Sequence, residues 1–67
     1  MVLVTKDKYG RRSYIEVVQL MEDSNGLDAF GETQDGTPFR QNIKYIEYDY
    51  VGVVVEGRHD VLHDKRN

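Results

Sequence analysis

Side chains able to do chemistry are scarce in this sequence, and the densest set lies near its C-terminal end. His59 and His63 are the only histidines, and each is followed by an aspartate, Asp60 or Asp64. On a helix, this i, i+4 spacing would place both imidazoles on one face, as helical metal ligands are placed. The sequence supplies no further histidine and no cysteine for a third or fourth ligand. We therefore expect a charged tail over residues 58–67 and no metal.

Motifs of catalysis are equally weak. The only serines are Ser13 and Ser24, both histidines lie in the tail, and no glycine-rich phosphate loop is present. A pair of carboxylates can do acid–base work, but nothing in the pattern selects one pair from twelve acids. The sequence therefore predicts a non-enzymatic protein without catalytic residues, cofactor or small-molecule substrate.

A basic loop over residues 6–12 is one candidate binding site. Residues 1–12 carry a net charge of +3 and include an aromatic residue, Tyr9, among the cations. Cations contact phosphates and a ring can stack on a base, so the loop predicts a nucleic-acid contact. The residues of this site would be Lys6, Lys8, Tyr9, Arg11, Arg12, Arg40 and Lys44. The other interpretation is a solvated hairpin loop, which suits a chain with a net charge of −3.

Tyrosines and carboxylates form a second candidate site. Five of the seven aromatic residues are tyrosines, whose large apolar body and polar tip favour interfaces. Residues 13–57 carry nine acids and a net charge of −7, a surface suited to a basic partner. The partner-binding residues would be Tyr14, Tyr45, Tyr48, Tyr50, Glu47 and Asp49. Alternatively, the rings form the small core, and the acids keep the protein soluble and protect its strand edges.

Strands must position these side chains, because Val, Ile and Tyr supply most of the large residues. No long window has helical spacing of apolar residues. Tight-turn signals at residues 23–26 and 35–36 separate the strand candidates. We expect strands at 2–5, 13–22, 27–33, 37–41 and 46–56, with a 3-10 turn at 42–45. In the last strand, Tyr48 and Tyr50 should share one face, and the change of polarity at Gly52 predicts a bend or bulge.

This order of elements resembles the SH3-like or Sm-like small β-barrel. The resemblance is carried by residues 35–46 (DGTPFRQNIKYI), with a hairpin, an aromatic strand, a short turn and the start of the final strand. It implies an all-β, five-stranded antiparallel barrel over residues 1–57, with Ile43 anchoring the turn and Ile46 as the next core residue. A polar tail would follow over residues 58–67. Barrels of this kind bind RNA, DNA, peptides and proteins, so the resemblance does not choose between the two sites.

Composition suggests the setting. A chain of 67 residues without cysteine has no disulfides, which favours a cytoplasmic location, and no apolar run approaches the ~20 residues of a membrane span. A domain of this size buries only about 60% of its unfolded surface and is marginal alone. Apolar residues on both faces of segments 13–22 and 46–55 therefore predict a protein partner or self-association. We expect a docking module, such as a phage or mobile-element accessory protein acting on a host factor, with nucleic-acid binding as the alternative.

Overall fold

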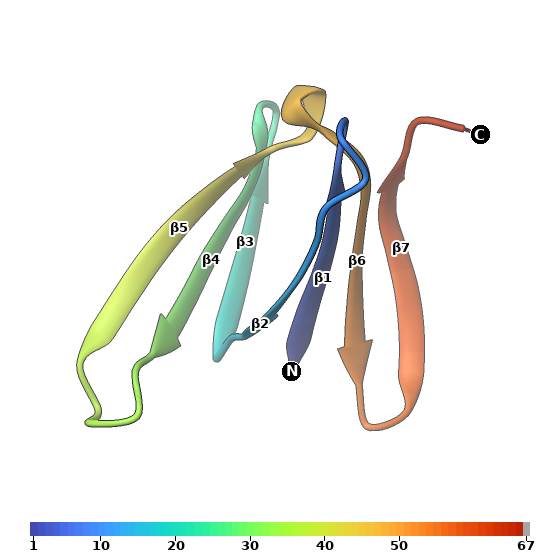
Figure 1. Ribbon diagram of the computed structural model, residues 1–67. Helices are drawn as coiled ribbons and strands as arrows, with labels where there is room; N and C mark the ends of the chain where they lie inside the picture. Colours follow the sequence, from blue (N-terminus) through green and yellow to red (C-terminus); the bar gives the residue numbers. More distant parts are fainter. Residues whose placement is uncertain (67) are drawn as a thin grey trace.

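Seven strands and one 3-10 turn make up the computed structural model, which describes residues 1–66 (Figure 1). The elements are β1 (Val2–Asp7), β2 (Arg12–Glu16), β3 (Gln19–Asp23), β4 (Gly26–Glu32), β5 (Pro38–Lys44), η1 (Tyr45–Glu47), β6 (Tyr48–Val55) and β7 (Arg58–Asp64). They form a four-stranded sheet of order β2–β1–β6–β7 and a three-stranded sheet of order β3–β4–β5, both antiparallel. The all-β class is thus confirmed, but the five-stranded barrel is wrong, because residues 1–66 form two sheets and no closed barrel. No helix within these residues has the length and apolar character needed to cross a membrane.

The strand predicted over residues 13–22 is in fact two strands in different sheets. The N–H of Val17 donates to the carbonyl of Met1 (2.8 Å) at the end of the four-stranded sheet. The N–H of Val18 donates to the carbonyl of Phe30 (2.7 Å) in the three-stranded sheet. Val17 is 2% exposed, whereas Val18 is 66% exposed. The apolar residues at both odd and even positions therefore mark the point where the chain passes from one sheet to the other.

The polar tail predicted over residues 58–67 is a strand over Arg58–Asp64, and residue 67 lies outside the described residues. β7 pairs with β6 along its length, and Leu62 packs against the core. The connecting turn has positive φ at both central residues, 49° at Glu56 and 79° at Gly57, as a type I′ hairpin requires. Glutamate is an unusual residue for such a position, which is why the turn gives little sequence signal.

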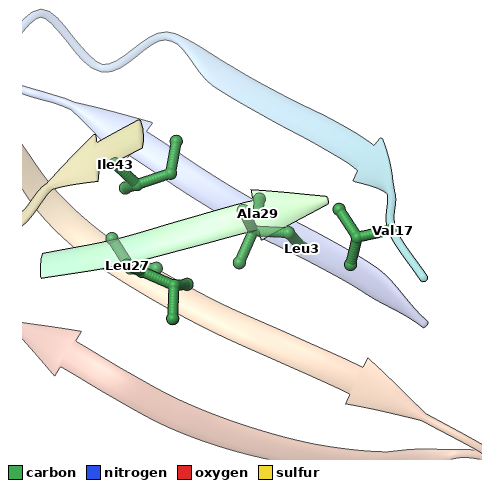
Figure 2. Packing of buried hydrophobic residues seen from close by; sticks show 6 residues of the cluster. Leu3, Val17, Leu27, Ala29 and Ile43 are labelled. Atoms are coloured by element: carbon green, nitrogen blue, oxygen red, sulfur yellow. The ribbon is translucent and has the colours of Figure 1, made fainter. Parts of the chain in front are cut away.

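The core lies between the two sheets (Figure 2). Its buried residues are Leu3, Val17, Leu27, Ala29, Ile43 and Val51. Ile43 is fully buried, which confirms its predicted role, but Ile46 is 80% exposed. The 3-10 turn occupies Tyr45–Glu47 instead of residues 42–45. Side chains three residues apart align in such a turn, so Tyr45 and Tyr48 face the core and Ile46 turns outward.

A β-bulge in β6 separates two tyrosines that were predicted to share a face. Lys6 lies opposite Tyr50, but Asp7 lies opposite Tyr48, so Asp49 is an extra residue in the ladder. Tyr48 consequently packs against the core, whereas Tyr50 is on the opposite side of the sheet. A second register shift lies between Val51 and Gly52 in the pairing with β7, but its extra residue is Leu62 of β7, so the bulge predicted in the strand at Gly52 lies in the neighbouring strand instead.

Candidate functional site

The four-stranded sheet has an outer face, turned away from the core, on which twelve side-chain positions form three rows. Residues directly opposite each other in antiparallel strands point to the same face, so the pairings define the rows in the strand order β2, β1, β6, β7. The cation row consists of Arg12, Lys6, Tyr50 and Asp64. The apolar row consists of Tyr14, Val4, Gly52 and Val61. The edge row consists of Glu16, Val2, Val54 and His59.

A hollow of about 400 Å³ lies on this outer face. It is lined by Val4, Thr5, Lys6, Arg12, Tyr14, Tyr50, Val54, His59 and Arg66. Three of these residues carry a positive charge and three carry an aromatic or imidazole ring. Such a lining combines the two contacts that an anion with flat ring groups needs.

A hydrogen-bonded pair of rings, Tyr50 and His59, lies above Gly52 in the hollow. The Tyr50 hydroxyl contacts Nε2 of His59, and the two rings meet nearly at right angles (86°) with centroids 6.1 Å apart. They fit there because Gly52 has no side chain. A Cβ at this position would lie 2.5 Å from the Tyr50 hydroxyl oxygen and 2.9 Å from His59 Nε2. Gly52 therefore leaves the space that the pair occupies.

The cations of the hollow come from three separate segments. Lys6 and Arg12 face each other across β1 and β2. The ion pairs among residues 1–66 leave both without a carboxylate within 4.0 Å. Arg66 follows β7, where its N–H and its Nε both donate to Oδ1 of Asp64, at 3.0 and 3.4 Å. The N–H of Lys65 donates to the carbonyl of Asp49 (2.9 Å), which fixes this turn against β6.

The loop between β1 and β2 is organised by Asp7. Its carboxylate accepts hydrogen bonds from the N–H groups of Tyr9 (2.8 Å) and Arg11 (2.9 Å) and from Nε of Arg11 (2.9 Å). Desolvation raises the pKa of Asp7, but these hydrogen bonds and the guanidinium charge outweigh it, so the pKa lies below its ordinary value of 3.8. Arg11 also stands 5.3 Å from the ring centroid of Tyr9, which is 83% exposed. Tyr9 and Arg11 thus shape the loop and do not line the hollow.

The remaining predicted nucleic-acid residues lie apart from the hollow. Lys8 is exposed in the same loop, and Lys44 is exposed at the end of β5 in the other sheet. Arg40, also in β5, pairs with Asp28 at 3.0 Å. The hydrogen bond from Asn42 to Asp28 (2.7 Å), joined by the contact from Arg40, holds the pKa of Asp28 below 3.8 against its desolvation. Only Lys6 and Arg12 of the predicted basic set therefore enter the hollow.

The predicted partner-binding tyrosines are divided between two environments. Tyr14 and Tyr50 line the hollow. Tyr48 packs against the core beside Tyr45, whose ring stacks on His63 with centroids 5.1 Å apart. The Tyr45 hydroxyl is buried without a hydrogen-bond partner in the described residues, and burial raises its pKa. The structure thus brings two of the four tyrosines together with two of the predicted cations.

The two predicted acids of that set lie at the start of β6. Glu47 is exposed in η1, and Asp49 is half-buried at the bulge. Neither lines the hollow.

His59 and Arg66 also line the hollow, but neither was predicted as a binding residue, because both lie in the segment predicted to be a tail. Their only signal is the hairpin at Glu56 and Gly57, which returns the chain beside β6. The same strand separates the two histidines, because His59 pairs with Val54 on the outer face whereas His63 stacks on Tyr45. Within residues 1–66 no group of three or more His, Asp or Glu side chains is placed to hold a metal ion.

Comparisons of the chain with protein-family models, curated proteins and solved structures found no match. The geometry and charge of the outer face indicate what it can bind. Its lining combines cations with exposed rings and apolar surface, so it suits contact with an anionic ligand that has flat faces.

Proposed function

We propose that this protein is a non-enzymatic binding module that takes nucleic acid on the outer face of its four-stranded sheet. The observation that carries the proposal is the convergence of Lys6, Arg12 and Arg66 with Tyr14 and Tyr50 in one hollow. These five residues come from β1, β2, β6 and the turn that follows β7. Cations supply the contact to phosphates, and the rings supply faces on which bases stack.

The net charge of −3 does not oppose this function, because the charges are segregated. The three rows of the outer face contain two carboxylates, Glu16 and Asp64, and Asp64 is occupied by Arg66. Charges separated by more than about 10 Å are largely screened at 0.1 M salt. A phosphate in the hollow therefore interacts mainly with Lys6, Arg12 and Arg66.

Binding of a fluorescein-labelled, mixed-sequence single-stranded DNA, followed by fluorescence anisotropy at several salt concentrations, tests the proposal. With three cations engaged, we expect the logarithm of the association constant to fall with the logarithm of salt concentration at a slope of about −2. Replacing the cations of β1 and β2, Lys6→Gln with Arg12→Gln, should reduce the slope to about −0.7. The charge-matched control, Lys44→Gln with Arg58→Gln, removes two cations that do not line the hollow and should leave the slope unchanged.

Two results would contradict the proposal. One is the absence of any anisotropy change at low salt, and the other is equal weakening by the control variant. The second result would assign binding to the overall charge and not to the outer face.

Docking of a protein partner stays a prediction. Of its six predicted residues, Tyr14 and Tyr50 are in the hollow, whereas Tyr45 and Tyr48 pack against the core. Affinity capture from host lysate with and without nuclease separates the two functions, because capture through nucleic acid is lost after nuclease treatment.

A further inference from the structure

The outer face separates charge from apolar surface in adjacent rows. The cation row holds Arg12 and Lys6, and Arg66 joins it by its contact with Asp64. The neighbouring apolar row carries no charged residue at all. Residues two positions apart on a strand are separated by about 7 Å, so the two rows run side by side at that distance. A ligand that spans both rows must have charges along one edge and apolar groups along the other.

The apolar row is accessible at its two ends, where Tyr14 is 66% exposed and Val61 is 55% exposed. Between them, the side chains of Tyr50 and His59 occupy the space above Gly52, which is itself buried. A flat group can therefore reach the row at its β2 end and lie against the ring of Tyr14.

The length of the rows limits the ligand. Four strands at a spacing of about 4.8 Å make each row about 14 Å long. This length corresponds to the lower end of the known range of about 4–16 nucleotides for single-strand sites on small barrels.

Resting on the proposed function, we infer that the ligand is single-stranded nucleic acid, with its phosphates along the cation row and a base stacked on Tyr14 at the β2 end of the apolar row. Duplex presents phosphates to the cations but keeps the faces of its bases stacked on one another. It gains the charge contacts of Lys6, Arg12 and Arg66 and lacks the contact with Tyr14. Single strands gain both contacts and bind more tightly at equal salt concentration.

The test compares a labelled deoxyoligonucleotide of about 12 nucleotides with the duplex formed with its complement, a length within the range of single-strand sites. Anisotropy titrations with the full chain should show at least about tenfold tighter binding of the single strand, the contribution of one stacked base. Tyr14→Leu should remove about tenfold of the single-strand affinity and leave duplex binding unchanged, because it removes the ring and keeps an apolar side chain. Tyr14→Phe keeps the ring and should bind within about twofold of the original protein.

The exposure of Tyr14 makes both variants compatible with the fold, and circular dichroism melts verify this. Equal affinity for single strand and duplex, or an equal loss in Tyr14→Leu and Tyr14→Phe, overturns the inference but leaves nucleic-acid binding standing. Absence of binding to either probe overturns the proposed function together with the inference.

Discussion

Replacing Gly52 by alanine should change the shape of the hollow while the four-stranded sheet keeps most of its stability. The added Cβ would lie 2.5 Å from the Tyr50 hydroxyl oxygen and 2.9 Å from His59 Nε2, and both are ends of side chains that can move. The backbone at Gly52 has no positive φ, so alanine fits its conformation. The substitution should therefore disturb the pair above Gly52 without separating the strands.

The expected loss of stability is small. Breaking the exposed hydrogen bond between Tyr50 and His59 costs about 1 kcal/mol. The lower conformational entropy of alanine in the unfolded chain returns about 0.4–1 kcal/mol. The free energy of unfolding, measured by urea denaturation, should thus fall by no more than about 1 kcal/mol. Oligonucleotide affinity should fall by about tenfold, because two ring residues of the hollow are displaced.

Gly26→Ala is the matched comparison. Gly26 has a φ of 141°, and a Cβ there would overlap the backbone carbonyl of Ile43 in the paired strand β5. Since neither backbone can yield without breaking the ladder, we expect a loss of about 3 kcal/mol or more. The reasoning is refuted if Gly52→Ala is as destabilising as Gly26→Ala, or if it leaves oligonucleotide affinity unchanged.

Three further predictions concern the fold and its coupling to the site. In urea denaturation, Ile43→Val should lower the free energy of unfolding by about 1 kcal/mol and Ile46→Val by less than about 0.5 kcal/mol, because only Ile43 is buried. Equal losses in the two variants would contradict the assignment of Ile43 to the core. Because the pKa of Asp28 is lowered in the folded protein, its ionised carboxylate stabilises the fold above pH 3.8, and this stability is lost as the pH falls through the folded-state pKa. Asp28→Asn should therefore make the melting temperature depend less on pH in the acid range. An unchanged dependence on pH would contradict the stabilising role of the Asp28 carboxylate. A chain ending at residue 64 should keep the melting temperature of the full chain and bind nucleic acid more weakly, because it lacks Arg66. A chain ending at residue 57 should be less stable, because it loses β7 and with it Leu62. Equal melting temperatures of the two truncated chains would show that β7 does not support the fold.

Local signals were enough to predict much of the fold. The strand composition gave the all-β class, and the Asn25-Gly26 signal marked the β3–β4 hairpin. The resemblance of residues 35–46 to a small barrel implied Ile43 as the apolar anchor of the short turn, and this residue is fully buried. Each of these features depends on a few neighbouring residues, which is the range over which sequence patterns act.

Pairings between distant segments were the features that the sequence did not reveal. The passage between sheets at Val17 and Val18 has the same apolar pattern as a continuous strand. The bulge at Asp49 depends on the register between β1 and β6, and it places Tyr48 and Tyr50 on opposite faces. The hollow needs the same registers, so its cations were predicted as part of a loop and its tyrosines as part of a separate surface.

Backbone amide chemical shifts, recorded by NMR during titration with a short single-stranded oligonucleotide, test most directly whether the outer face binds nucleic acid. We expect the largest shift changes at Lys6, Arg12, Tyr14, Gly52 and Arg66, which lie on that face or beside it. Residues of β3, β4 and β5 belong to the other sheet and should change little. Changes concentrated in those three strands, or no changes at low salt, would contradict the assignment of the site.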